Sequence, residues 1–330
     1  FDPKHYEIEG KVRASSWNAQ LKGGNVETFH AFKGIVRRRH PARDEWYNKL
    51  LKEVSKKKPL KKKQHKGDTA YIFTMSDWQL GKVDLGVEKT LKRYDKALER
   101  AVQEVRSLGT IDEIYLLSMG DLTEGCYGFY DSQPHNISLN LSQQYHLARK
   151  LIMKTVDTFL PYANKIVLSG VPANHGEQSR SGKGQVVTSR LDNSDTMHLE
   201  ICGEIMEQNP RYDKVEVSIP EGFHHTLKIK NLTVGFTHGH MHAGGTGPEG
   251  KIMKWWQGQM FGDFPVGDAE ILITGHFHHP RMMQQGNRTW FQCPSIDASI
   301  DFTARTGMWS KPGVLTFTID KDGWDNYKIV

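Results

Sequence analysis

The chain has 330 residues, of which 37% are hydrophobic and 10% aromatic, enough for one large domain with a sizeable core and a smaller one. No apolar run approaches the length of a membrane-spanning helix, and no signal peptide is visible in a sequence that begins at Phe1. The three cysteines lie far apart without C-x-x-C spacing, which argues against a disulfide framework and a zinc ribbon. We therefore expect a cytoplasmic protein that does not bind membranes.

The net charge of +6 is unevenly distributed along the chain. Residues 1–66 contain 18 Lys and Arg residues against 7 Asp and Glu residues, whereas the remainder contains 26 against 31. This asymmetry indicates a basic appendage on a mildly acidic body.

The first 68 residues are predicted to form a small β-rich unit and a linker. Residues 5–17 and 26–39 can pair as strands around a turn near Gly23-Gly24-Asn25, and an amphipathic helix is expected at about 43–54. Like charges repel one another in the lysine-rich run 56–63, so this run should be extended and solvated. The predicted divisions are a basic N-terminal domain at 1–55, a linker at 56–68 and the main domain at 69–330.

Strands alternate with helices in the first half of the main domain. The apolar runs 71–75, 114–119 and 166–168 have the length of buried strands. The helical spacing of apolar residues predicts helices at 87–108, where Gly109 follows as a stop, and at 141–159. This β-α-β-α-β order implies parallel strands joined by right-handed crossovers.

The second half of the main domain is rich in strands after a further helix at about 197–206. Strands are expected at 215–219, 226–229, 232–237, 271–274, 289–292 and 314–319. Their short spacings favour antiparallel pairing. The predicted fold is therefore of the α/β (α+β) class, a two-sheet β-sandwich flanked by helices.

Five polar clusters each follow a short apolar strand of the main domain. They are Ser76-Asp77-Trp78-Gln79, Gly120-Asp121-Leu122-Thr123-Glu124, Ala173-Asn174-His175-Gly176-Glu177, His238-Gly239-His240 and Gly275-His276-Phe277-His278. Each cluster alone is an ordinary turn sequence, but five of them at strand ends would converge on one crevice. Mixed carboxylate and imidazole ligands suit Mn²⁺, Fe or Zn²⁺ better than Mg²⁺ or Ca²⁺, so the set predicts a transition-metal site.

As an ordered set, these clusters resemble the calcineurin-like metallophosphoesterase superfamily, over residues 69 to about 320. The pattern of that family is Asp-x-His, Gly-Asp-x-x-(Asp/Glu), Gly-Asn-His-(Asp/Glu), His and Gly-His-x-His. The resemblance implies a helix-flanked two-sheet sandwich that hydrolyses phosphate esters with two adjacent divalent metal ions, Mn²⁺ being favoured and Fe or Zn²⁺ the alternatives.

The same resemblance assigns the site residues by position. The implied ligands of the first metal are Asp77, Gln79, Asp121 and His278, and those of the second are Asp121, Asn174, His238 and His276. His175 would face the substrate phosphate, so His175 and Asp121 are the predicted catalytic residues. Two such cations, about 3.5–4 Å apart, lower the pKa of a bridging water, and the resulting hydroxide attacks phosphorus in line.

Three positions depart from the family pattern. Gln79 stands where the family usually has His, and its neutral oxygen is a harder ligand than imidazole, so the first metal should be bound more weakly. Ala173 replaces the usual Gly, which is a mild change. Gly176 separates His175 from Glu177, so the acid that usually orients the histidine is displaced.

The substrate is less specified than the chemistry. The basic arm could neutralise the phosphates of DNA, and unpaired bases could stack on aromatic residues near the motifs, namely Trp78, Tyr127, Phe129, Tyr130, Trp255 and Trp256. His240, Arg180 and Lys183 are further predicted substrate contacts, although a solvated loop is an equally good interpretation of residues 179–184. We predict a phosphodiesterase or nuclease that binds nucleic acid.

Two other functions remain open. One is a small-molecule or nucleotide phosphatase or phosphodiesterase, and the other is a non-catalytic nucleic-acid-binding module. The segment from Ser76 to Gly81 also looks like the opening motif of SbcD-type DNA-repair nucleases, but Glu124 stands where those have His. The arrangement is more similar to bacteriophage-encoded metallophosphoesterases, which would place the protein in a host cytoplasm.

Overall fold

The computed structural model describes residues 6–20, 26–38, 43–60, 64–83, 86–178, 186–242, 246–297, 303, 307 and 309–330. The chain divides into two compact units, Phe1–Leu50 and Leu51–Val330. None of the helices in these described segments is both long and apolar enough to cross a membrane.

The first unit contains a two-stranded antiparallel ribbon of β1 (Tyr6–Gln20) and β2 (Val26–Arg38). The two strands pair as the sequence predicts, with a shift of register between Glu9 and Arg13. The expected turn at residues 23–25 lies outside the described residues. Trp17 stacks on Phe29 with ring centroids 6.0 Å apart, yet Trp17 is 51% exposed, so the ribbon has little core of its own.

The segment after α1 (Arg43–Ser55) is anchored rather than free. The side-chain amide of Asn209 donates to the carbonyl oxygens of Val54 at 2.7 Å and Lys57 at 3.1 Å. The ammonium of Lys57 forms an ion pair with Asp157. The prediction of a solvated linker is therefore wrong at Lys57, while residues 61–63 lie outside the described part of the chain.

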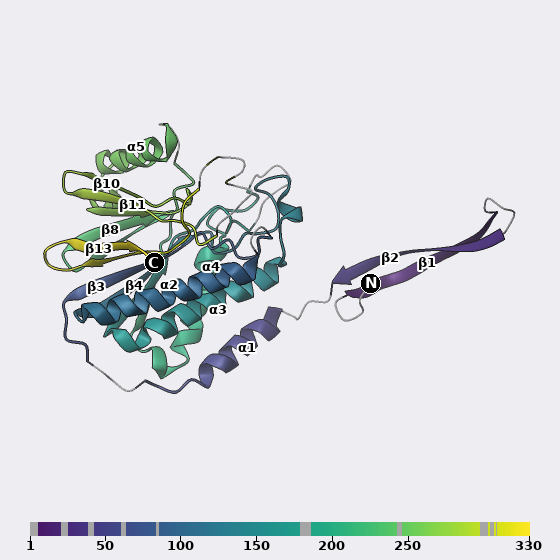
Figure 1. Ribbon diagram of the computed structural model, residues 1–330, viewed down its shortest axis with the longest axis horizontal. Coiled ribbons are helices and arrows are strands. Elements are labelled where there is room, and N and C mark those ends of the chain that lie inside the picture. The colour runs from purple at the N-terminus through teal and green to yellow at the C-terminus, as the bar shows by residue number, and fades with distance from the viewer. Residues whose placement is uncertain are drawn as a thin grey trace. The chain divides into compact units, whose positions relative to one another are not determined.

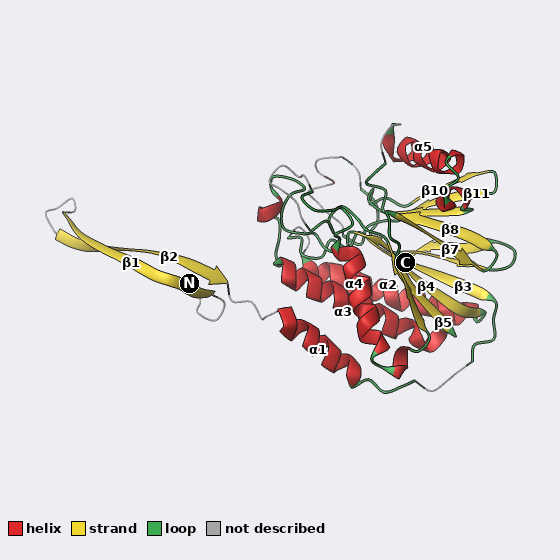
Figure 2. Cartoon of the chain, turned by 180° about the vertical axis from the view of Figure 1, so that it is seen from behind, coloured by secondary structure: helices red, strands yellow, loops and turns green. Residues whose placement is uncertain are grey.

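The second unit is built on two sheets (Figures 1 and 2). The six-stranded sheet has the order β13-β12-β3-β4-β5-β6. Its strands are β3 (Thr69–Ser76), β4 (Ile111–Gly120), β5 (Lys165–Gly170), β6 (Val215–Ser218), β12 (Leu315–Ile319) and β13 (Trp324–Ile329). The five-stranded sheet has the order β10-β11-β9-β8-β7. Its strands are β7 (His224–Ile229), β8 (Leu232–Thr237), β9 (Ile271–Thr274), β10 (Arg281–Gln285) and β11 (Arg288–Gln292).

Helices cover the outer faces of both sheets (Figures 1 and 2). On the six-stranded sheet lie α2 (Val87–Leu108), α3 (Leu141–Phe159) and α4 (Ser194–Glu207), and on the five-stranded sheet lies α5 (Gly247–Phe261). Phe73 of β3 packs against Tyr94 of α2 and Phe159 of α3, with ring centroids 6.2 and 5.2 Å away. Trp256 of α5 lies in a buried cluster with Trp290 of β11. Four short 3₁₀ helices lie in the described segments of the unit, at Gln133–His135, Leu160–Tyr162, Pro210–Tyr212 and Pro265–Asp268.

A continuous apolar core lies between the two sheets. It includes Ile72 of β3 and Leu117 of β4 from one sheet, and Phe236 of β8 and Ile273 of β9 from the other. Such burial is the main favourable term in folding, at roughly 25 cal/mol per Å² of apolar surface. The fold is therefore the predicted two-sheet α/β sandwich flanked by helices.

The helices with the clearest sequence signals match their predicted bounds. α2 ends before Gly109, which adopts φ 68°, and α3 begins with a capping box between Asn140 and Gln143. α4 begins at Ser194, three residues before the predicted start at residue 197, because the side chain of Asn193 caps the helix directly before Ser194.

The strand-rich half contains the errors of prediction. β6 pairs with β5 in parallel, not antiparallel, because α4 supplies the crossover that a parallel pair needs. β8 is likewise parallel to β9, and β9 to β11. The helix α5 and the strands β10 and β13 were not expected from the sequence.

Candidate metal centre

The five polar clusters follow strands whose carboxyl ends the structure brings together. β3, β4 and β5 run parallel in one sheet, and β8 and β9 run parallel in the other. Backbone hydrogen bonds join two clusters directly: the amide of Asp77 donates to the carbonyl of Gly120 at 3.0 Å, and the amide of Gln79 donates to that of Asp121 at 2.9 Å. These backbone hydrogen bonds continue the pairing of β3 and β4 into the loops, so the distance between the two loops is fixed.

The backbone at this edge is strained where the predicted ligands stand. Left-handed φ values between 42° and 69° occur at Asp77, Gln79, Asp121, His276 and His278. Such conformations cost of order 1–3 kcal/mol each in residues other than glycine. They persist where the surrounding structure enforces them, and five of the eight left-handed residues other than glycine found in the described segments gather at this edge.

Four lone-pair-bearing side chains converge at the predicted second metal position. Ligand atoms of Asp121, His238 and His276 lie within 4.8 Å of one another, and they form the one such group found in the described segments. Nε2 of His238 lies 3.1 Å from Oδ2 of Asp121 and 2.9 Å from Oδ1 of Asn174. Nδ1 of His238 lies 2.6 Å from the carbonyl of Met119, which can only accept, so Nδ1 carries a proton and Nε2 is the atom that faces the cluster. This set fits a divalent cation held by two imidazoles, a carboxylate and an amide oxygen.

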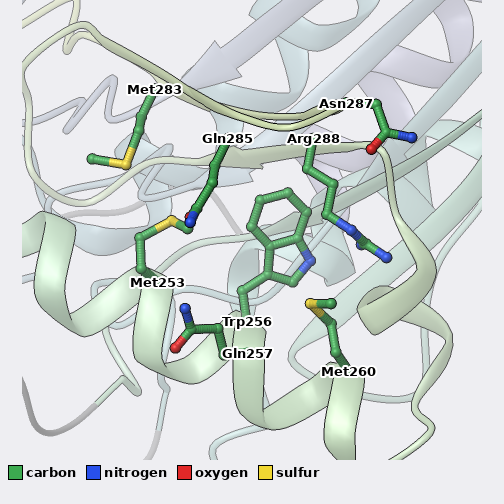
Figure 3. A pocket seen from close by; sticks show the side chains of 8 residues that line it. All are labelled: Met253, Trp256, Gln257, Met260, Met283, Gln285, Asn287 and Arg288. Carbon is green, nitrogen blue, oxygen red and sulfur yellow. The ribbon is translucent and has the colours of Figure 1, made fainter.

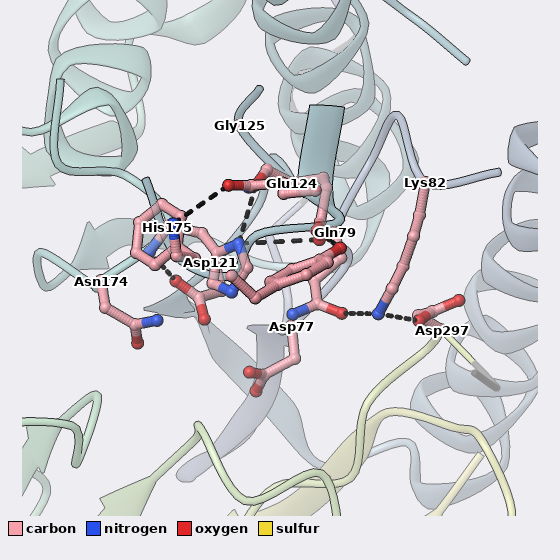
Figure 4. A network of polar contacts seen from close by, with 12 residues as sticks. Asp77, Gln79, Lys82, Asp121, Glu124, Gly125, Asn174, His175 and Asp297 are labelled. Carbon is pink, nitrogen blue, oxygen red and sulfur yellow. Dashed lines mark hydrogen bonds and ion pairs between the residues drawn. The ribbon is translucent and has the colours of Figure 1, made fainter. Parts of the chain in front are cut away.

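The predicted first metal position is less complete. Oδ1 of Asp77 lies 3.2 Å from Nε2 of His278, and the Asp77 carboxylate accepts hydrogen bonds from the amide of His276 and the hydroxyl of Ser76. The side-chain oxygen of Gln79 accepts a hydrogen bond from the ammonium of Lys82 at 2.8 Å (Figure 4). At the first position, one predicted ligand atom is therefore already hydrogen-bonded to a lysine, whereas at the second position all four predicted ligands face one another.

Burial and mutual attraction set the charges of these groups. Burial alone would raise the pKa of Asp121, but the neighbouring imidazoles of His238 and His175 hold this pKa well below its usual range. Burial, reinforced by His238, lowers the pKa of His276 to about 3. Burial opposes protonation of His238 as well, yet the Asp121 carboxylate raises the pKa of His238 to about 9. Asp121 is thus anionic and His276 neutral, the states in which these side chains bind metals, whereas His238 would release its Nε2 proton to a metal that binds there.

Asp195, in the first turn of α4, binds the backbone of the loop that carries Asp121. Asp195 was not identified from the sequence. Its carboxylate accepts hydrogen bonds from the amides of Asp121 at 3.1 Å and Leu122 at 3.0 Å. Burial and the nearby Asp121 carboxylate raise the pKa of Asp195 to about 7. The helix-capping residue Asn193 was the available signal, because acidic residues are common in the first turn after such a cap.

Asp195 also accounts for the departure at Gly176. A Cβ atom at position 176 would lie 2.4 Å from a carboxylate oxygen of Asp195 and 2.2 Å from the side-chain oxygen of Asn193. Glu177 is consequently displaced and pairs with Arg190 at 2.8 Å. The structure therefore leaves no room for an acidic residue directly after His175.

His175 is held by three neighbours, two of which, Asp121 and Glu124, are labelled in Figure 4. Its backbone amide donates to Oδ1 of Asp121 at 2.8 Å, and its Nδ1 donates to the carbonyl of Glu124 at 2.7 Å. The imidazole stacks on Phe129 with ring centroids 4.2 Å apart and planes within 6°. Because Nδ1 is engaged, Nε2 is the ring atom that remains to meet a substrate.

Of the remaining predicted substrate contacts, the structure describes only His240. His240 is nearly buried, with its ring centroid 5.3 Å from that of His238 and its Nε2 3.8 Å from the Glu177 carboxylate. Arg180 and Lys183 lie outside the described residues.

The aromatic residues near the motifs do not act as one surface. Trp78 and Trp256 are only 1% and 2% exposed, so the suggestion that they stack on bases is wrong. Phe129 is taken by His175, and Trp255 stacks on His242 with ring centroids 4.0 Å apart. Tyr127, at 53% exposed, remains the most accessible of the set.

A separate pocket lies between α5 and the β10–β11 hairpin (Figure 3). It has a volume of about 280 Å³ and is lined by methionine, tryptophan and amide side chains. The guanidinium of Arg288 at its wall donates to the carbonyls of Gly267 and Ala269. None of the predicted metal ligands lines this pocket, so it is distinct from the metal centre.

Comparisons with known proteins find similar solved structures but no sequence relative. No family model and no curated protein matches the chain. An archaeal phosphodiesterase shares 13% identity over 79% of this chain and 99% of its own length, with a TM-score of 0.36. Zinc-complexed Vps29 from Entamoeba histolytica shares 13% identity over 79% and 98%, with a TM-score of 0.32. A hypothetical protein from Pyrococcus horikoshii shares 11% identity over 79% and 87%, with a TM-score of 0.39. These values are too low to transfer any activity to this chain.

The environment of Gln79 generates a first prediction. Gln79→His should tighten metal binding at the first position by about tenfold. The reason is that imidazole would supply a nitrogen ligand, whereas the amide oxygen of Gln79 already accepts a hydrogen bond from Lys82. Titration calorimetry with Mn²⁺ measures the change, and Gln103→His, at an exposed position of α2, is the control. Unaltered or weaker binding in Gln79→His would show that position 79 does not face a metal.

Proposed function

We propose that this protein is a metal-dependent phosphoesterase that cleaves phosphodiesters, with DNA as its substrate and two divalent ions, most suitably Mn²⁺, as its cofactors. The observation that carries the proposal is the convergence of Asp121, Asn174, His238 and His276 at the carboxyl ends of parallel strands, with His175 fixed beside them. Divalent ions bound there would supply positive charge to the phosphate and make a bound water acidic enough to attack near neutral pH.

The residues of the chain contribute orientation and proton transfer. Asp121 is anionic and is bound at the same time to the amide of His175 and to the His238 imidazole, so it fixes both relative to one another. The Glu124 carbonyl and Phe129 hold the His175 ring by its other edge and its face. As the imidazolium, with both ring nitrogens protonated, His175 can then donate from Nε2 to a phosphoryl oxygen or to the leaving oxygen in the transition state.

DNA is proposed as the substrate on the basis of charge. Residues 1–66 carry a net charge of +11, and counterion release makes such basic segments bind nucleic-acid backbones. Lys57 is already paired with Asp157, so the arm's contribution would come from its other basic residues.

A substrate panel tests the proposal directly. Purified protein with Mn²⁺ is incubated with single-stranded DNA, duplex DNA, RNA, a bis-aryl phosphodiester and an aryl phosphomonoester. We expect turnover of DNA and of the aryl diester, abolished by a chelator and by Asp121→Ala. Turnover of the monoester alone would identify a small-molecule phosphatase. DNA binding without turnover of any substrate would identify a binding module.

His175 and Asn174 are expected to separate catalysis from metal binding. His175→Asn should keep the bound metal and near-normal substrate binding but lose about 10²–10³ in kcat, because its contact forms mainly in the transition state. Asn174→Ala should instead lose metal at the second position. Metal stoichiometry and kcat are measured on both variants with the aryl diester. A fully active His175→Asn variant, or one depleted of metal, would overturn the assigned role.

The N-terminal arm gives a separate prediction. Deleting residues 1–42 removes the ribbon but spares the anchoring contacts of Val54 and Lys57. DNA binding should weaken, and its log–log salt dependence should flatten by about 0.7 for each lost phosphate contact to single-stranded DNA. Turnover of the aryl diester should survive, because all five motifs lie outside the deletion. An unchanged salt slope would show that the arm does not bind the DNA backbone.

A further inference from the structure

Lys82 is a cation that the protein itself places beside the predicted first metal position. Its ammonium donates to the side-chain oxygen of Gln79 at 2.8 Å and pairs with Asp297 at 3.1 Å (Figure 4). The Lys82 side chain is 16% exposed and that of Asp297 only 3%, so water screens this pair weakly. Gln79 stands at a ligand position, yet the oxygen that would bind a metal already accepts from an ammonium.

The loop that carries Lys82 is held on both sides. The carbonyl of Gly81 accepts hydrogen bonds from the backbone and the hydroxyl of Ser138, and the amide of Val83 donates to Asn136 at 2.8 Å. Gly81 itself has φ 113°, and a Cβ atom there would lie 2.5 Å from the side chain of Gln144. Lys82 therefore extends from a fixed backbone toward Gln79.

Because of this arrangement, the charged side chains around the first metal position differ from those around the second. At the second position, the partner of Asp121 is the imidazole of His238, which is itself a predicted ligand, and none of the ion pairs found in the described segments joins a lysine or arginine to Asp121, Asn174, His238 or His276. At the first position, any cation that used the Gln79 oxygen would compete with the Lys82 ammonium for it. Two like charges in a poorly screened site repel strongly.

We propose that Lys82 makes the metal centre asymmetric: a divalent ion binds tightly at the second position, while the first position fills only at higher metal concentration. Lys82 acts by donating a hydrogen bond to the Gln79 oxygen and by placing a positive charge beside it. The ion pair with Asp297 holds the Lys82 ammonium in this position. The inference rests on the proposed metal centre and assigns a role to a residue pair outside the five motifs.

Metal titration of the full-length protein tests the asymmetry. Calorimetry with Mn²⁺ should resolve two binding events whose dissociation constants differ by about tenfold or more. The spectroscopic signature of two spin-coupled Mn²⁺ ions, seen by electron paramagnetic resonance, should appear only in the second event. Both readouts are independent of activity.

The decisive variant is Lys82→Met/Asp297→Asn, which removes both charges without leaving a buried ion unpaired. It should tighten the weaker event by about tenfold and leave the tighter event unchanged, so that the coupled Mn²⁺ signal appears at lower metal concentration. The matched control is Lys92→Met/Glu88→Gln, which removes an exposed ion pair of α2 and should alter neither event. Lys82→Arg, which keeps the charge, should keep the first position weak.

The outcomes separate this inference from the proposed function. Two events of equal affinity in the unaltered protein, or a weak event that Lys82→Met/Asp297→Asn does not tighten, would overturn the role of Lys82 while leaving the metal centre in place. A protein that binds no Mn²⁺ at all would overturn the metal centre and this inference together.

Discussion

Asp121 is buried at the point where both sheets and three loops meet, and most of the centre depends on its carboxylate. One oxygen accepts from the backbone of His175, and the other lies 3.1 Å from His238 of the second sheet. Its own amide is bound by Asp195, which α4 presents from outside the sandwich. A buried carboxylate is costly unless such partners surround it, so the fold must place strand ends, loop and helix together for this one group to remain charged.

The left-handed backbone conformations at the ligands are the counterpart of that constraint. The sandwich core and the backbone bonds between the clusters at Asp77 and Asp121 are extensive enough to hold several strained residues at once. Each of these residues directs a side chain into a space that regular strand geometry would not reach. The stability of the sheets thereby holds the predicted ligands of the second metal position close together in the absence of a cation.

The sequence predicted the sandwich and the five clusters because local patterns encode them. Helical periodicity with a stop at Gly109 defined α2, and an ordered set of Asp, Asn and His at strand ends defined the edge where they gather. The parallel pairing of β6 and the covering helix α5 escaped notice, because pairing partners are selected by tertiary contacts. The Lys82–Asp297 pair was missed for the same reason, because its members are 215 positions apart in the chain and no local pattern links them.

The position of β12 bears on how the chain reaches its native state during synthesis. Thr316 of β12 pairs with Phe73 of β3, so the flank of β3 is covered by a strand that is synthesised much later than β3 itself. Until then, β3 presents an unpaired and highly apolar edge, the kind of surface that promotes association between chains. Closing contacts of such sequence separation is slow. Nascent chains that stall before residue 315 should therefore be the aggregation-prone species, and chaperone binding would be most valuable in that interval.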